Sequence, residues 1–326
     1  MITKNNINVL DLFCGCGGFS QGFKESGFNV VAGIDIWDKA IETYKNNHNH
    51  LSLCKDLIEY DPKQLSEEYN IKKVDIIIGG PPCQGFSNAG KRDVSDPRNS
   101  LFMEFKKYID YYNPDMFIME NVMGILSMKT KKGEKCIDII CDLLKKNYNI
   151  NISKLYASDF EVPQNRRRVL IFGIRKDLKL FPYEPKYIIK EKLNRIPVST
   201  ILEKENDIDP SYLLSEKAIT GIIKKKERMK KEGKGFGAQI LKLDKPSYTI
   251  PARYWKDGYD ALVKYSDNKI RRLTIVELAR IQTFPDYYKF IGSKKDRIIQ
   301  IGNAVACRFS YHIANHIYKM FLNIDN

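Results

Sequence analysis

Short, uniformly apolar segments alternate with amphipathic ones through residues 7–174, and this alternation restricts the possible folds more than any other feature of the sequence. The pattern predicts strands and helices in turn over 7–13, 19–27, 29–35, 38–47, 73–80, 100–112, 115–121, 134–147 and 168–174. Strands that are apolar throughout are buried on both faces, and helical crossovers join strands in parallel. We therefore expect a doubly wound α/β domain, with a mostly parallel sheet and helices on both of its faces.

The alternation stops near residue 181, where the sequence becomes rich in proline and strongly basic. Between Lys176 and Lys269, 21 Lys and Arg stand against 14 Asp and Glu, so this stretch holds +7 of the net +14 of the chain. The charge favours a polyanionic partner, nucleic acid before an anionic membrane, although a Lys-rich source proteome explains it equally well. We expect a small, irregular second domain here, followed by a helix over 273–284 and a long C-terminal helix that packs back on the core.

The seven cysteines are odd in number, scattered and without any C-x-x-C pair, which argues against a disulfide framework and a zinc ribbon. The pairs His48/His50 and His312/His316 have no nearby carboxylate set, so no metal site is expected. The N-terminal residues run into a strand-like segment without a signal sequence, and no apolar run reaches the ~20 residues of a membrane span. These features predict a cytosolic protein with reduced thiols.

A glycine-rich turn follows the first expected strand, in the string DLFCGCGG over 11–18. Gly15, Gly17 and Gly18 allow a sharp bend and the close approach of a ligand to a helix N-terminus. Asp35 ends the second strand, where nucleotide-binding folds place the acid that holds ribose hydroxyls. Asp56 would lie at the tip of a third strand, over the same crevice. Because the glycine spacing is not G-x-G-x-x-G, the pattern favours S-adenosylmethionine over a dinucleotide.

Cys83 lies directly behind two prolines in GGPPCQGFSNAG, at the carboxyl end of an expected strand, where α/β enzymes have their active sites. The prolines make its approach rigid. Glu120 ends the neighbouring strand, where a carboxyl is either a structural acid or, beside a nucleophile, a proton donor. In QNRRRVLIFG, Arg166 and Arg168 share one face of a strand and Arg167 takes the other. The first two can therefore hold a carbonyl oxygen or a phosphate.

A thiol, a carboxylic acid, arginines and a methyl-donor site suit one reaction together. Carbon-5 of cytosine is too electron-poor to attack a methyl group, but addition of a thiolate at carbon-6 makes carbon-5 nucleophilic. An acid at ring nitrogen 3 stabilises the charge that develops, and an arginine at the exocyclic oxygen holds the ring. In duplex DNA the base must first leave the stack.

Over its whole length the chain resembles the DNA (cytosine-carbon-5) methyltransferases of the compact bacterial restriction-modification type. Seven motifs occur in the order of that family: DLFCGCGG, GIDIWD, GGPPCQGFS, ENV, QNRRRV, RRLTIVELARIQTFP and IGNAV. Any one of them is a weak signal, whereas seven in order are specific. The resemblance implies a Rossmann-like, S-adenosylmethionine-dependent fold and an enzyme that methylates carbon-5 of a flipped cytosine in double-stranded DNA.

The resemblance also assigns roles to individual residues. Cys83 matches the nucleophile, Glu120 the acid at ring nitrogen 3, and Arg166 and Arg168 the pair that positions the base. Pro82 and Asn121 complete the expected catalytic set. The expected cofactor contacts are Phe13, Cys14, Gly15, Cys16, Gly17, Gly18, Asp35, Ile36, Asp56, Leu57, Pro82, Leu101, Asn303 and Ala304.

Two neighbouring residues compete for one place in that cofactor set. Ile36 corresponds to the residue that lies against adenine, whereas Trp37 falls one place late and is assigned to packing.

The architecture of the family implies four segments. Residues 1–180 form the catalytic domain, which 298–326 complete; 181–270 form a small target-recognition domain, and 271–297 a supporting hinge region. The expected DNA contacts are Gln84, Ser87, Arg98, Gln164, Thr249, Ile250 and Arg253. The Lys-rich run at 224–234 is either a site of unspecific phosphate attraction or a solvated helix. Duplex DNA is the expected partner of a monomeric enzyme in the bacterial cytosol, and a separate cognate restriction endonuclease is compatible with it.

Two other functions remain open. A tRNA-methylating relative would carry a Cys-Phe-Thr signature in the recognition region, but no cysteine lies between Cys141 and Cys307. A catalytically inactive DNA-binding regulator is disfavoured by the intact Pro-Cys, Glu-Asn-Val and Gln-x-Arg-x-Arg sets. No motif reveals the DNA sequence that is recognised or the group that removes the carbon-5 proton.

Overall fold

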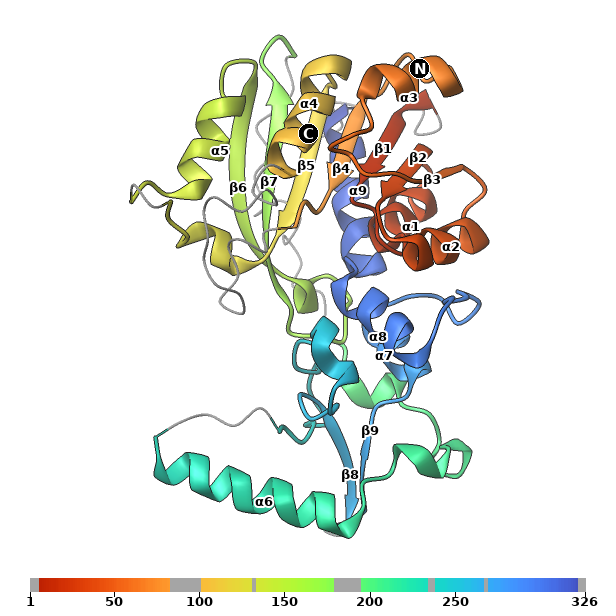
Figure 1. Ribbon diagram of the computed structural model, residues 1–326, viewed down its shortest axis with the longest axis vertical. Coiled ribbons are helices and arrows are strands. Elements are labelled where there is room, and N and C mark those ends of the chain that lie inside the picture. The colour runs from red at the N-terminus through yellow and green to blue at the C-terminus, as the bar shows by residue number, and fades with distance from the viewer. Residues whose placement is uncertain are drawn as a thin grey trace.

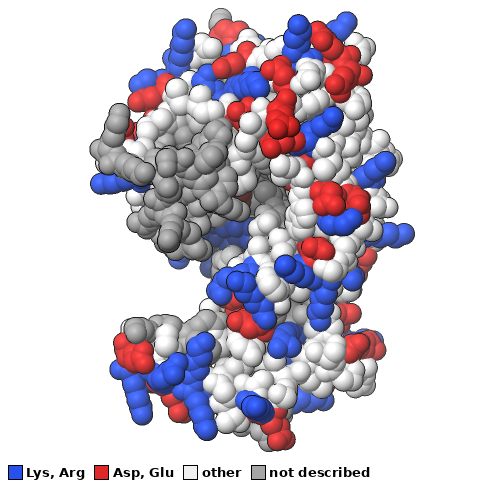
Figure 2. Space-filling view, in the orientation of Figure 1, with Lys and Arg blue, Asp and Glu red and all other residues white. Residues whose placement is uncertain are grey.

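The computed structural model describes residues 6–82, 101–130, 133–178, 195–233, 238–266 and 269–321. They form a large part built on a sheet and a smaller part below it in the view of Figure 1. Figure 2 shows a hollow between the two parts, with Lys and Arg side chains on both sides of it. None of the described helices is long and apolar enough to cross a membrane.

The large part is built on a seven-stranded sheet. Its strands, in spatial order, are β3 (Leu51–Cys54), β2 (Asn29–Asp35), β1 (Asn8–Leu12), β4 (Ile76–Gly79), β5 (Met116–Asn121), β7 (Arg167–Arg175) and β6 (Tyr148–Tyr156). All neighbours pair in parallel except β7, which is antiparallel to both β5 and β6. The expected mostly parallel sheet is confirmed. Because the strand order reverses between β1 and β4, a ligand crevice is expected at their carboxyl ends.

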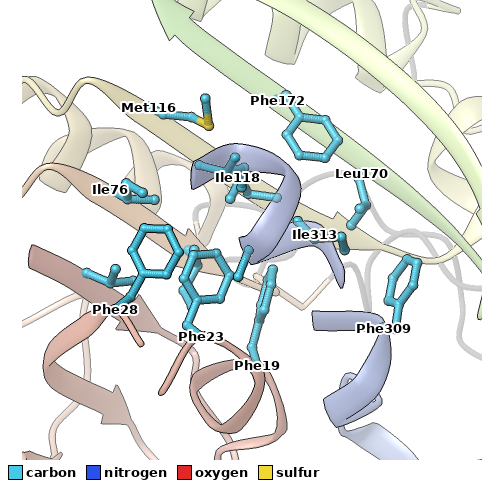
Figure 3. Packing of buried hydrophobic residues seen from close by; sticks show 14 of the residues in the cluster. Phe19, Phe23, Phe28, Ile76, Met116, Ile118, Leu170, Phe172, Phe309 and Ile313 are labelled. Atoms are coloured by element: carbon cyan, nitrogen blue, oxygen red, sulfur yellow. The ribbon is translucent and has the colours of Figure 1, made fainter. Parts of the chain in front are cut away.

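Two apolar layers cover the faces of this sheet. One is formed with α1 (Gly18–Glu25) and α9 (Cys307–Phe321), the other with α3 (Pro62–Tyr69), α4 (Leu101–Tyr112) and α5 (Cys136–Leu144). Figure 3 shows the first layer, in which Phe23 of α1 and Ile313 of α9 lie against strand residues such as Ile118. The C-terminal helix therefore returns to the sheet and packs beside the first helix of the chain.

Tight packing also fixes α2 (Asp38–Asn47), which follows β2. A Cβ atom at Gly33 would lie 2.3 Å from the ring of Tyr44, so glycine lets this helix approach the strand closely.

The smaller part contains α6 (Glu216–Lys231), β8 (Leu262–Ser266) and β9 (Lys269–Arg272), and α7 (Ile275–Ile281) and α8 (Lys294–Asn303) connect it to the sheet. Arg271 and Glu277 form a fully buried ion pair at its base, with 2.7 Å between Nη1 and Oε2. Glu277 also completes a capping box with Thr274, which starts α7. Short 3-10 turns cover Met123–Leu126, Ala157–Asp159, Val198–Ile201, Glu205–Asp207, Pro210–Tyr212 and Ala252–Trp255.

Candidate active site

A cavity of about 580 Å³ opens at the carboxyl ends of the central strands. It brings together residues that are far apart in the sequence and that the motifs predicted. The predicted residues that line it are Phe13, Cys14, Gly15, Cys16, Asp35, Pro82, Glu120, Asn121, Arg166, Arg168, Thr249, Asn303 and Ala304. Those that are described but do not line it are Gly17, Gly18, Ile36, Asp56, Leu57, Leu101, Gln164, Ile250 and Arg253. Cys83, Gln84, Ser87 and Arg98 lie outside the described residues.

The glycine turn forms the floor of the cavity between β1 and α1. The N–H of Gly15 donates to Oδ2 of Asp35 at 2.9 Å, and a Cβ at this glycine would meet no atom within 4 Å. Gly17 and Gly18 are different, since a Cβ there would lie 2.5 Å from His48 Nε2 and 2.2 Å from the Val305 carbonyl oxygen. Gly15 therefore leaves space for a ligand, whereas Gly17 and Gly18 allow the turn to pack against the protein.

Asp35 ends β2 with its carboxylate held in place. Its two oxygens accept hydrogen bonds from the N–H of Gly15 and the N–H of Trp37, each at 2.9 Å. Burial raises its pKa above the usual value, and these two hydrogen bonds oppose that shift. Trp37, assigned to packing from the sequence, lines the cavity, whereas the Ile36 side chain is 65% exposed and does not. An aromatic wall beside a fixed carboxylate suits an adenosine group.

The other predicted cofactor residues near β3 lie away from the cavity. Asp56 accepts a hydrogen bond from the N–H of Ile58 at 3.0 Å, which closes the turn after β3. Leu57 is buried in the apolar layer that α4 and α5 cover, and Leu101 is the first residue of α4. The structure therefore gives Asp56 and Leu57 local structural contacts, and their contact with a cofactor stays a prediction.

Asp11 lines the cavity, although the sequence interpretation assigned it no role. Its carboxyl is 1% exposed; Oδ2 accepts a hydrogen bond from Ser20 at 2.6 Å, and Oδ1 has no partner among the described residues. The hydroxyl groups of Ser20 and Tyr44 bond each other at 2.6 Å, and that of Tyr44 reaches His50 Nε2 at 2.6 Å. The sequence signal was a lone acid within an otherwise apolar strand.

We expect Asp11 to make the protein less stable as the pH rises. Burial raises its pKa from 3.8 to about 8, so between these values the folded state holds a proton that the unfolded state has lost. The free energy of unfolding then falls with rising pH, by up to about 1.4 kcal/mol per unit. Asp11→Asn cannot ionise and should be more stable than the wild type at about pH 9. Parallel urea-unfolding profiles of the two proteins from pH 5 to about pH 9 would contradict this assignment.

Glu120 and Arg168 meet inside the cavity from the neighbouring strands β5 and β7. Arg168 Nε lies 2.5 Å from Glu120 Oε1, and both side chains are nearly buried. The antiparallel register places Glu120 opposite Leu170. Asn121, the next residue, is buried and donates from Nδ2 to the carbonyl oxygen of Pro81 at 3.2 Å. It thereby ties the end of β5 to the Pro-Pro segment that leads into Cys83.

Arg166 also lines the cavity, but its bonds go to the backbone. Its guanidinium is 3% exposed and donates to the carbonyl oxygens of Ile250 at 3.3 Å and Gly302 at 3.0 Å. Burial lowers its pKa well below the usual value. Arg167 takes the opposite face of the strand and lies over the Tyr156 ring. The predicted sharing of one face by Arg166 and Arg168 agrees with the structure, yet only Arg168 pairs with Glu120.

The predicted DNA contacts that the structure describes differ in their accessibility. Gln164 and Ile250 are fully buried and bond each other through the N–H of Ile250 at 2.9 Å, so as placed neither side chain can reach a base. Thr249 lines the cavity and donates to the carbonyl oxygen of Asn165 at 2.9 Å. Arg253 is 62% exposed and pairs with Asp260 at 2.7 Å. Thr249 and Arg253 therefore remain the accessible candidates.

The histidine pairs have protein partners. His48 Nε2 lies 3.0 Å from the hydroxyl of Tyr288, and burial lowers the pKa of His48 to about 3 and that of His50 to about 4. His312 bonds Glu161 at 2.8 Å. Within the described residues there is no group of three or more His, Cys, Asp or Glu that could hold a metal ion.

The residues that meet in the cavity are those of the predicted motifs, and a comparison with known families decides what they belong to. The family model of C-5 cytosine-specific DNA methylases matches residues 7–319. The chain belongs to that family. It is an S-adenosylmethionine-dependent DNA methyltransferase of the restriction-modification type, so the expected family, enzyme class and cofactor are confirmed.

Curated relatives and solved structures agree with this family over nearly the whole chain. The type II methyltransferase M.FnuDI of Fusobacterium nucleatum is 35% identical over 95% of this chain and 94% of its own length. M.DdeI of Desulfomicrobium norvegicum is 31% identical over 98% and 90%. A DNA modification methyltransferase encoded within a prophage of E. coli superposes with a TM-score of 0.76 at 26% identity, covering 97% of this chain and 99% of its own. Dnmt2 of S. pombe, at 22% identity over 98% of this chain and all of its own, with a TM-score of 0.77, shares the fold.

The cavity fits the cofactor of this family. S-adenosylmethionine carries positive sulfonium and ammonium groups, and a cation beside Asp11 would favour its ionised form. Oδ1 of Asp11, which has no partner among the described residues, would then be a buried acceptor beside the turn. Asp35 and Trp37 offer a carboxylate and an aromatic ring at the other strand end. Asn303 and Ala304, at the end of α8, close the same wall. These residues would hold the methionine and adenosine parts of the cofactor.

Proposed function

We propose that this enzyme methylates carbon-5 of a cytosine flipped out of a specific duplex DNA sequence, through a covalent bond between Cys83 and carbon-6. The observation that carries the proposal is the pairing of Glu120 with Arg168 inside the cavity that Pro82, the residue before Cys83, also lines. The Glu120 carboxyl and the Arg168 guanidinium can hold the polar edge of a pyrimidine while a nucleophile attacks its ring.

The residues that precede Cys83 support its role. Pro81 and Pro82 follow β4 and line the cavity, and Asn121 at the end of β5 bonds the carbonyl oxygen of Pro81. In the proposal, the Cys83 thiol meets a pyrimidine whose ring nitrogen 3 faces Glu120. Cys14 and Cys16, which line the cavity, are weaker candidates for the nucleophile, because burial raises the pKa of both thiols and keeps them protonated.

In this proposal, Glu120 and Arg168 exchange the bond between them for bonds to the base. When cytosine enters, Arg168 donates to the exocyclic oxygen and the Glu120 carboxylate takes up a proton from solvent, which it gives to ring nitrogen 3. The Cys83 thiol loses its proton to solvent, and its sulfur bonds to carbon-6. The electron pair of the carbon-5–carbon-6 double bond then makes carbon-5 nucleophilic. S-adenosylmethionine, when bound, supplies the methyl group that carbon-5 takes up. Loss of the carbon-5 proton to a base or water, expulsion of the thiolate and return of the nitrogen-3 proton to Glu120 release the methylated base.

The DNA side of the site is proposed from accessibility and charge. Residues 181–270 would form the recognition domain, with 271–297 as its support and 298–326 completing the catalytic domain of 1–180. Thr249 and Arg253 are accessible there, and Gln84, Ser87 and Arg98 belong to the segment that follows the nucleophile. Arginine can read guanine in the major groove. The protein would act in the bacterial cytosol as a monomer and needs no endonuclease for its own reaction.

The test of this function compares nucleic acids. Expression of the protein in cells without cytosine methylation, followed by bisulfite sequencing, should reveal methylcytosine at one short DNA sequence. The purified enzyme should then transfer radioactive methyl groups from S-adenosylmethionine to a duplex with that sequence and leave tRNA unmodified. Transfer to tRNA alone would replace the proposal by the RNA function, and binding of DNA without transfer to either would favour an inactive regulator.

A further inference from the structure

A cluster of three buried side chains joins distant segments at the wall of the cavity, which Arg166 itself lines. It consists of Gln164, Arg166 and Gln282, and we call it the clasp. The exposed fractions of these residues are 0%, 3% and 0%. Gln164 and Gln282 bond each other, with 2.9 Å between Nε2 and Oε1. Polar side chains buried this completely need several partners, and the partners of the clasp lie on two different sides.

On one side the clasp holds residues 249–252 of the proposed recognition domain, which we call the recognition segment. The N–H of Ile250 donates to Gln164 Oε1 at 2.9 Å, and the carbonyl oxygen of Ile250 accepts from Arg166 Nη1 at 3.3 Å. Both backbone polar groups of Ile250 are therefore bound by side chains of the clasp. The adjacent residue, Thr249, lines the cavity. Its position is thus set through the segment that leads into β7.

On the other side the clasp holds the end of α8. Arg166 Nη2 donates to the carbonyl oxygen of Gly302 at 3.0 Å, and Gln282 Nε2 donates to those of Ile301 at 2.8 Å and Ala304 at 3.1 Å. The last carbonyls of a helix have no partner within the helix, so these bonds cap α8. A positive guanidinium at this end also suits the helix dipole. Asn303 and Ala304, which line the cofactor wall, are thereby fixed.

The two segments held by the clasp touch each other directly. A Cβ at Gly302 would lie 2.6 Å from the backbone nitrogen and Cα of Ala252, so only glycine allows this approach. Pro251 and Ala252 line the cavity beside Gly302. The recognition segment and the end of α8, with Asn303 and Ala304, therefore form one wall of the site together. Arg166 bonds to both of them.

We propose that Arg166 is a positioning residue that couples the binding of cofactor to the binding of DNA. The inference rests on the proposed function, and it replaces the predicted contact of Arg166 with the base. A ligand bound to the recognition segment or to the end of α8 reduces the backbone motion of that segment. Because the planar guanidinium of Arg166 bonds to both, the motion of the other segment is reduced as well. The second ligand then loses less conformational entropy on binding. Because coupling is reciprocal, DNA and cofactor strengthen each other's binding by the same factor.

The experiment measures this factor with S-adenosylhomocysteine, which binds without reacting. Its dissociation constant is determined by calorimetry, with and without a duplex that contains the methylated sequence found by bisulfite sequencing. For the wild type we expect DNA to strengthen binding by about 5-fold or more. In Arg166→Lys one ammonium cannot span both carbonyl groups, and we expect less than about 2-fold. An unchanged factor in this variant, or no coupling in the wild type, would overturn the proposal.

Three further variants separate coupling from other effects. Arg168→Lys should lose turnover and retain the coupling factor, because Arg168 bonds to neither segment. Arg271→Lys disturbs another buried arginine and should lower the melting temperature without changing the factor. Should Arg166→Lys fail to fold, Gly302→Ala takes its place, since its methyl group pushes Ala252 off α8. Failure of the proposed function looks different, because the wild type would then transfer no methyl group to DNA.

Discussion

Replacing Cys83 by serine is expected to lower methyl transfer to DNA by at least about 10⁴-fold, the order seen when a covalent nucleophile is removed. A serine hydroxyl in the same place is far less ionised than a thiol at neutral pH and adds poorly to carbon-6. Single-turnover assays with radioactive S-adenosylmethionine measure the loss. Binding of S-adenosylhomocysteine should remain within about 3-fold, because the residues that line the cofactor end of the cavity are unchanged.

A trapping experiment tests the same sulfur by a second route. In DNA with 5-fluorocytosine at the target position, fluorine cannot leave carbon-5 as the proton does, so the wild-type enzyme should accumulate a covalent complex visible on a denaturing gel. Cys83→Ser should form none. Cys141→Ser is the matched control, since Cys141 lies on α5 and outside the cavity lining. A variant of Cys83 that still forms the complex, or an active wild type that does not, would rule out thiol addition.

The central strands could be predicted because they are buried on both faces. The pattern places β2 over 29–35 and α2 over 38–47, and both occur with those bounds. β6 was missed, since its sequence YNINISKLY alternates polar and apolar residues, as an edge strand does. α3 was missed although Asp61 and Gln64 form a capping box at its start and Pro62 stands at its first position. The antiparallel insertion of β7 between β5 and β6 depends on long-range pairing, which no local pattern contains.

The site residues, too, could be predicted where local sequence sets their position and could not where long-range packing does. Gly15 and Asp35 could each be identified from their own motifs, because a turn determines the place of the first and a strand end that of the second. Arg166 was assigned to the base because strand alternation gives the face of a side chain and not its partner. Its partner Gly302 lies 136 residues away, and only packing of α8 brings it there. Asp11 was missed for a related reason: one of its oxygens has no partner among the described residues, and only the folded cavity shows this.

Glu120→Gln is expected to reduce turnover by roughly 10²- to 10⁴-fold, the usual contribution of a positioned general acid. The amide can still lie beside Arg168, but it cannot transfer a proton to ring nitrogen 3, so the thiol adds to a ring whose developing charge is not neutralised. Formation of the covalent complex with 5-fluorocytosine DNA should slow by the same factor. The measurement is the rate of that complex in a rapid-quench experiment, with cofactor affinity determined alongside.

Glu161→Gln is the matched control for this substitution. Glu161 pairs with Arg308 and His312, as Glu120 pairs with Arg168, but it lies outside the residues that line the cavity. Removing its charge should lower the melting temperature and leave the rate of methyl transfer near that of the wild type. If Glu120→Gln lost no more activity than Glu161→Gln, the carboxyl on β5 would be one half of a structural ion pair. Protonation at nitrogen 3 would then have to come from water, and the reaction would need no acid from the protein.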